Sequence, residues 1–208
     1  NPIIIPNATN ANTGTYTVTV TDSNECFSTD TASISVGSEL NLSVQPSSIV
    51  LCPGSDLNIT ADISGGSGGY NYSWSGPNGF ISNLKTITIN NVSSSNSGTY
   101  NITVTDSSGC AISGSSTVTV NSDLVASIAP NTLDVCVGGT INLSAQVSGG
   151  SGIYTYLWSG PSGFYSNNDS ISISNVNSVN SGIYQVIVTD SNGCTDTATS
   201  TVSVNSLV

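Results

Sequence analysis

Five cysteines are the residues of this sequence best suited to covalent chemistry. Cys26, Cys110 and Cys194 lie 84 residues apart, and Cys52 and Cys136 keep the same interval. Cysteines at periodic positions in a polar chain are typical of disulfide bonds formed in an oxidising compartment, with free buried thiols as the alternative. Because the sequence has no histidine and no Cys-x-x-Cys pair, we do not expect zinc binding.

Other reactive side chains are scarce. Among 208 residues there is one basic residue, Lys85, and 12 acidic residues give a formal net charge of −11. Acid–base catalysis draws on histidine, lysine or a perturbed carboxylate, and phosphate recognition needs arginine or lysine. We therefore expect no enzyme activity, no cofactor and no nucleic-acid partner. Asp169 stands at the position of Lys85 in the next repeat, so a lysine isopeptide bond cannot occur in every repeat.

The interval of 84 residues also defines the fold. A fixed period of this length indicates an array of small domains. Each repeat is expected to contain about seven short strands, with a tryptophan near the third, which predicts an all-β fold of tandem immunoglobulin-like β-sandwiches. In the second repeat the apolar residues that alternate with polar ones fall in five segments: 57–63, 70–74, 87–89, 100–104 and 118–120.

The repeated aromatic residues have predicted structural roles. A glycine lies two residues before each of Tyr16, Tyr100 and Tyr184. This spacing predicts a tyrosine corner, in which the hydroxyl bonds back to the preceding turn. Trp74 and Trp158 are expected in the core. The alternative is an exposed aromatic platform, built with the Gly-Pro-x-Gly-Phe segment that follows each tryptophan, on which sugar rings could stack.

The period divides the chain into three segments. Residues 39–121 and 122–208 each form an immunoglobulin-like repeat, and residues 1–38 match the end of one. That end comprises strand E (Ile3, Ile5), strand F (Tyr16, Val18, Val20) and strand G (Ile34, Val36). Such a half-sandwich leaves edges open. We expect its other half upstream, disordered or in a neighbouring molecule, and we interpret the sequence as part of a longer secreted protein.

The cysteine positions predict an interdomain bond. Cys52 precedes the strand at 57–63 (strand B) and Cys110 follows the strand at 100–104 (strand F), so the two lie at opposite ends of one sandwich, about 25 Å apart. A disulfide needs Cα atoms within about 7 Å. In a head-to-tail array Cys52 instead faces Cys194 of the next repeat. By the same rule, the partners of Cys26, Cys110 and Cys136 lie outside this sequence.

Two further kinds of site are possible in the turns and loops. Asp22, Asp106 and Asp190 recur in the turn after strand F and could bind calcium, although turn formation alone also explains them. Asn-x-Ser/Thr sequons are frequent, as at Asn58 and Asn71, and are expected often by chance in this composition.

Together these motifs resemble a known repeat family. The motifs are Cys-x-Gly at 52–54, Tyr-x-Trp-Ser-Gly-Pro-x-Gly-Phe at 72–80, and the segment from Gly98 to Cys110. They are similar to repeats of giant Bacteroidetes surface proteins secreted by the type IX system, which include the gliding-motility adhesin SprB and related PKD-like repeat proteins. The sequence departs from the pattern at Glu25, where the other repeats have glycine. The resemblance implies O-glycosylation at Asp-Ser/Thr-apolar motifs, with Thr31, Ser170 and Thr197 as candidates.

The expected function is therefore structural and adhesive. The resemblance implies a cell-surface fibre or adhesin stalk. With the interdomain disulfides predicted from the cysteine positions, we expect a semi-rigid thread or stalk whose partners are neighbouring repeats, surface polysaccharide or other cells. The neutral hydroxyl-rich surface suits an extracellular location, and no apolar run approaches membrane-spanning length. Two alternatives stay open: a self-assembling filament subunit completed by strand addition, and a spacer in a secreted hydrolase.

Overall fold

The computed structural model describes residues 2–206 and contains β-strands and short 3-10 helices. The first segment contains η1 (Asn10–Asn12), β1 (Gly14–Thr21) and β2 (Phe27–Ile34). The middle segment contains β3 (Ser38–Gln45), β4 (Ser48–Leu51), β5 (Leu57–Gly66), β6 (Asn71–Ser75), η2 (Pro77–Gly79), β7 (Ile81–Ser82), β8 (Thr86–Ile89), η3 (Ser94–Asn96), β9 (Gly98–Thr105) and β10 (Ala111–Val120). The last contains β11 (Val125–Ala129), β12 (Thr132–Cys136), β13 (Thr140–Ser148), β14 (Tyr154–Gly160), η4 (Pro161–Gly163), β15 (Phe164–Ser166), β16 (Ser170–Ser174), η5 (Ser178–Asn180), β17 (Gly182–Asp190) and β18 (Thr195–Asn205).

Two β-sandwiches follow one another along the chain. The two sheets of the middle segment have the strand orders β3-β5-β8 and β4-β10-β9-β6-β7. Those of the last segment have the orders β11-β13-β16 and β12-β18-β17-β14-β15. Apart from Ser38, which pairs with Gly66 at the start of β3, the paired residues of each sandwich lie within one 84-residue repeat. The predicted fold class, tandem immunoglobulin-like sandwiches, is confirmed.

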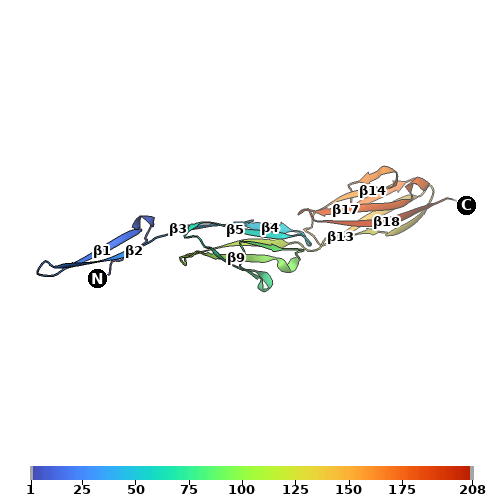
Figure 1. Ribbon diagram of the computed structural model, residues 1–208. Helices are drawn as coiled ribbons and strands as arrows, with labels where there is room; N and C mark the ends of the chain where they lie inside the picture. Colours follow the sequence, from blue (N-terminus) through green and yellow to red (C-terminus); the bar gives the residue numbers. More distant parts are fainter. Residues whose placement is uncertain (1, 207–208) are drawn as a thin grey trace. The chain divides into compact units, whose positions relative to one another are not determined.

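The core of the last sandwich follows from alternating side chains. In β17, Tyr184, Val186 and Val188 are fully buried, while Gln185 and Ile187 between them are only half-buried. The fully buried side chains pack against Trp158 of β14 and against Leu143 of β13 in the other sheet. Figure 1 shows β14, β17 and β18 of one sheet and β13 of the other. The middle sandwich repeats this pattern with Tyr100, Ile102 and Val104 in β9.

The first strand of each sandwich is divided between the two sheets. In the last sandwich, β11 pairs antiparallel with β13, and β12 pairs parallel with β18. Pro130 lies between β11 and β12, and Pro46 lies between β3 and β4. Proline has no amide hydrogen to donate to a ladder, so the strand ends there and the chain continues on the second sheet.

The first segment is a hairpin, and one of its predicted strands is wrong. β1 and β2 pair antiparallel from Gly14 opposite Ile34 to Thr21 opposite Phe27. Ile3 and Ile5 are not in a strand, and Val36 lies beyond the end of β2. The equivalent strands β8 and β16 pair with β5 and β13. Residues equivalent to β5 would fall before residue 1, so the strand at 3–5 has no partner in this sequence.

The chain also divides into two compact units, which do not coincide with the repeats. One unit comprises residues 49–57, residues 88–98 and the chain from residue 118 onward, and the other comprises the remaining described residues. The turn that carries Cys52 therefore belongs to the same unit as the last sandwich. The predicted segment boundaries at 38/39 and 121/122 stay predictions. Residues 1, 207 and 208 of the outer segments lie outside the described residues.

Candidate functional site

The turn that carries Cys194 is organised by a buried aspartate. Asp190 closes β17, and its Oδ1 accepts hydrogen bonds from the amides of Asn192 at 2.9 Å and Cys194 at 2.8 Å. Its Oδ2 accepts one from the amide of Ser151 at 2.9 Å. Gly193 has φ +82°, a left-handed conformation that glycine adopts without strain. Cys194 is thereby fixed directly before β18.

Hydrogen bonding sets the charge state of this aspartate. Burial of the Asp190 carboxyl favours a higher pKa, but the amides of Cys194, Ser151 and Asn192 and the Ser151 hydroxyl donate to the carboxylate and hold its pKa below the usual value. In the middle repeat, the amide of Ser67 is the main cause that lowers the pKa of Asp106. The turn is therefore built around an ionised side chain.

Cys52 lies in the turn between β4 and β5 of the middle sandwich. The amide of Ser55 donates to the Cys52 carbonyl at 3.2 Å, and the amide of Gly54 donates to the Val92 carbonyl at 2.8 Å. The first bond closes the turn, and the second connects it to the loop before η3. The sulfur of Cys52 is thus presented at one end of its sandwich.

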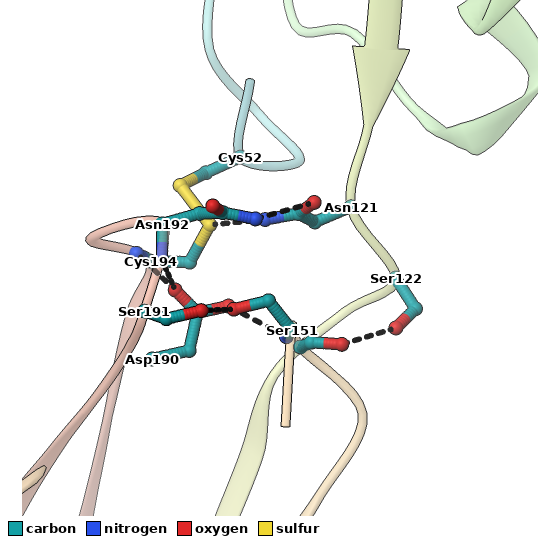
Figure 2. The surroundings of a disulfide bond; sticks show 9 residues. Cys52, Asn121, Ser122, Ser151, Asp190, Ser191, Asn192 and Cys194 are labelled. Atoms are coloured by element: carbon teal, nitrogen blue, oxygen red, sulfur yellow. Dashed lines mark hydrogen bonds between the residues drawn. A yellow bond between two sulfur atoms is a disulfide. The ribbon is translucent and has the colours of Figure 1, made fainter. Parts of the chain in front are cut away.

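A disulfide joins Cys52 and Cys194, which are 142 positions apart in the sequence (Figure 2). The S–S distance is 2.08 Å and the Cα atoms are 5.4 Å apart. These are the two cysteines for which the sequence predicts a bond. Cys26, Cys110 and Cys136 are free and exposed.

Asn121 lies beside this bond and was missed by sequence reasoning. Its Nδ2 donates to the Cys194 sulfur at 3.3 Å, and its Oδ1 accepts from Nδ2 of Asn192 at 3.2 Å (Figure 2). Its backbone amide donates to the carbonyl of Leu51, the residue before Cys52, at 2.9 Å. The sequence signal is the repetition of asparagine at position 205, one period later.

The aspartates considered as calcium ligands accept hydrogen bonds from backbone amides through their carboxylate oxygens. Asp106 accepts from the amides of Ser67, Ser108 and Cys110, matching the pattern of Asp190. Asp22 accepts from the amides at positions 24 and 26. Within residues 2–206, no group of three or more histidine, cysteine or acidic side chains is arranged to hold a metal ion. Asp22 therefore accepts from amides of its own turn, and Asp106 and Asp190 accept both from their own turn and from the loop that carries Ser67 or Ser151.

The two repeated tryptophans are buried. Trp74 and Trp158 are 1% and 0% exposed, and their indole N–H groups donate to the carbonyls of Leu84 and Asn168. The alternative of a sugar-binding tryptophan platform is wrong, because the indole faces pack inside the sandwiches. The hydroxyl of Tyr184 donates to the Asn180 carbonyl at 3.1 Å.

The hydroxyl contact recurs at Tyr16, and Tyr100 shares the burial of Tyr184. The hydroxyl of Tyr16 donates to the Asn12 carbonyl at 2.9 Å, four residues earlier, as in the last repeat. Tyr100 is buried, with its ring edge-on to Phe80 at a centroid distance of 5.5 Å. In the last repeat, the buried Tyr184 therefore fixes the turn before strand F to the sandwich core.

The remaining predicted sites lie at the surface. Thr31, Ser170 and Thr197 are exposed on strands β2, β16 and β18. The hydroxyl of Ser170 donates to the carboxylate of Asp169 at 3.0 Å. Lys85 forms an ion pair with Asp62 at 2.8 Å, and both side chains are more than half exposed. None of the helices in the described part of the chain is long and apolar enough to cross a membrane.

Comparison with protein families gives two partial matches. The immunoglobulin domain family matches residues 40–120, and the SprB repeat family matches residues 135–163. No curated protein matches the sequence. Both family matches indicate a surface or extracellular repeat of adhesive or structural type, and a non-catalytic module.

Solved structures with a similar fold include two multidomain proteins. The three N-terminal domains of the highly immunogenic outer capsid protein (Hoc) of bacteriophage RB49 are 20% identical to this chain, with a TM-score of 0.45; the alignment covers 80% of this chain and 59% of that one. The N-terminal four Ig domains of Dscam1 isoform 6.9 are 18% identical, with a TM-score of 0.43, and the alignment covers 86% and 51%. The chain thus spans less than two thirds of either solved chain. It is similar to immunoglobulin domains over one repeat and to the SprB repeat over part of the next.

Proposed function

We propose that this chain is a segment of an extracellular adhesive thread in which disulfide bonds tie consecutive repeats together. The observation that carries the proposal is the bond between Cys52 and Cys194, which belong to different 84-residue repeats. Disulfides of this kind persist in oxidising surroundings. By the same rule, Cys110 and Cys26 bond to preceding repeats and Cys136 bonds to a following one.

The bond gives the thread resistance to tension. Force applied to the two ends of the chain passes through β3 and β4, crosses from Cys52 to Cys194, and leaves through β18. Strands β5 to β17 lie inside the closed loop and carry no end-to-end force while the bond is intact. A covalent path of this kind keeps strands β5 to β17 from being extended under load.

The surface of the chain supports an exposed location. Charged residues make up 6% of the sequence, and a single lysine gives trypsin-like proteases almost no site to cleave. The match to the SprB repeat supports placement on the surface of a gliding bacterium after type IX secretion. Thr31, Ser170 and Thr197 are exposed and would carry glycans there. Weak contacts to polysaccharide or other cells, repeated along many domains, would add up through avidity.

A filament completed by strand addition is the second candidate. Val18 and Val20 of the hairpin are 57% and 65% exposed, whereas Ile102 and Val104, one period later, are 1% and 0% exposed. The hairpin thus presents an apolar face that is covered in the middle repeat. Strands supplied by a neighbouring molecule would cover it and link the chains into a polymer.

Electron microscopy of labelled cells tests both proposals. An antibody against residues 39–121 should label long surface threads on cells that produce the protein. Thread thickness then separates a single chain of sandwiches from a polymer. Label restricted to compact secreted material would overturn both and favour a spacer in a secreted hydrolase.

A further inference from the structure

We propose that Asn121 is a positioning residue that selects Cys194 as the partner of Cys52 and holds the two segments at bonding distance. This inference rests on the disulfide-tied junction proposed above. It assigns a role to the residue between the two repeats, for which neither the fold nor the family matches account.

Asn121 touches both halves of the bond. Its backbone amide donates to the Leu51 carbonyl and so fixes the segment that leads directly into Cys52. Its carboxamide reaches the other half, donating to the Cys194 sulfur and accepting from the Asn192 carboxamide (Figure 2). One residue thus connects two segments that are 142 positions apart.

These contacts do not require the disulfide. In the reduced protein, the amide can still donate to a thiol sulfur and to the Leu51 carbonyl. The two thiols are therefore held together before oxidation, which raises the effective concentration of one for the other. In a glutathione buffer the two thiols lose two protons and two electrons, and one oxidised glutathione becomes two reduced glutathiones.

Variation between the repeats supports a specific pairing. Asn121 and Asn192 are 71 positions apart. One period earlier the equivalent residues are Gly37 and Ser108, neither of which has a carboxamide. The sequence contains two such pairs of positions, and the residue types at both positions differ between them. Where the residue between two repeats is an asparagine, the residue two positions before the cysteine of the next repeat is an asparagine as well.

The test is the equilibrium between this disulfide and glutathione, measured by peptide mapping after acid quenching. Asn121→Asp keeps an acceptor for Asn192 but removes the donor to the Cys194 sulfur. Because a net hydrogen bond changes an equilibrium by about three- to tenfold, the equilibrium constant for forming the bond should fall by that factor. Asn205→Asp, the same change one period later, is the matched control and should leave the constant unchanged.

A protein without the disulfide shows whether Asn121 acts on the bond or on the stability of the fold in general. Asn121→Asp is introduced both into the unsubstituted protein and into the Cys52→Ser/Cys194→Ser variant, and the melting temperature is measured for each. If the substitution lowers the melting temperature equally in both and leaves the glutathione equilibrium unmoved, Asn121 is merely structural and the inference is overturned. If Asn121→Asp fails to fold, Asn192→Ser, the residue of the middle repeat, replaces it. Absence of the Cys52–Cys194 bond in the unsubstituted oxidised protein would instead overturn the proposed function.

Discussion

Removing the disulfide should lengthen the chain under force by an amount fixed by its loop. In the oxidised protein, the 142 positions between Cys52 and Cys194 are bypassed by a bond whose Cα atoms are 5.4 Å apart. A fully extended chain spans about 3.5 Å per residue. Replacing both cysteines with serine should therefore release about 500 Å of additional length once both sandwiches have unfolded.

Single-molecule force spectroscopy of the chain held at its two ends measures this length. The oxidised protein should reach full extension about 500 Å before the Cys52→Ser/Cys194→Ser variant. Adding a reducing agent to the unsubstituted protein should restore the missing length. Cys136→Ser, which alters a free exposed cysteine, is the control and should not change the contour length. Equal contour lengths for the oxidised protein and the double variant would refute the closed loop.

Three further predictions concern stability. In the chain-entropy model, loss of this loop closure lowers the free energy of unfolding by about 5 kcal/mol; urea denaturation of Cys52→Ser/Cys194→Ser measures it, and a change below about 1 kcal/mol would contradict that model. A Cβ at Gly160 would lie 2.7 Å from the buried ring of Tyr184, so Gly160→Ala should cost about 1–3 kcal/mol through overpacking, and an unchanged urea midpoint would show that the ring can move. The lowered pKa of Asp190 means that the folded state binds fewer protons than the unfolded chain, so its stabilisation is complete above the ordinary value of 3.8 and disappears as the pH falls through the folded value. Asp190→Asn should flatten this acid dependence in urea titrations below about pH 4, and an equally steep decrease would exclude the carboxylate as its source.

Much of the fold follows from local patterns in the sequence. The alternation of apolar and polar residues places β5, β9 and β17 correctly, because a strand with one buried face must repeat every two residues. The period of 84 residues fixes the number of sandwiches. The position of each cysteine relative to these strands was enough to predict a bond from Cys52 to Cys194.

Other features depend on partners that no local pattern specifies. Ile3 and Ile5 carry the alternation of a strand, yet they form none, because a strand needs a neighbour for its backbone hydrogen bonds. The division of each first strand between two sheets was also missed, since it depends on which ladder each half meets in space.

The sequence by itself determined the repeat, the strands, the polar uncharged surface and the cysteine spacing. Each of these is a property of residue type and order, which a strand period or a fixed interval reveals directly. Only the tertiary structure decided that the carboxamide of Asn121 lies against the sulfur of Cys194 and that the carboxylate of Asp190 collects amides from two loops. The contacts from Asn121 to Cys194 and from Ser151 to Asp190 join residues 73 and 39 positions apart. The recurrence of such residues every 84 positions marks them as part of the repeat, but it does not indicate which groups they contact.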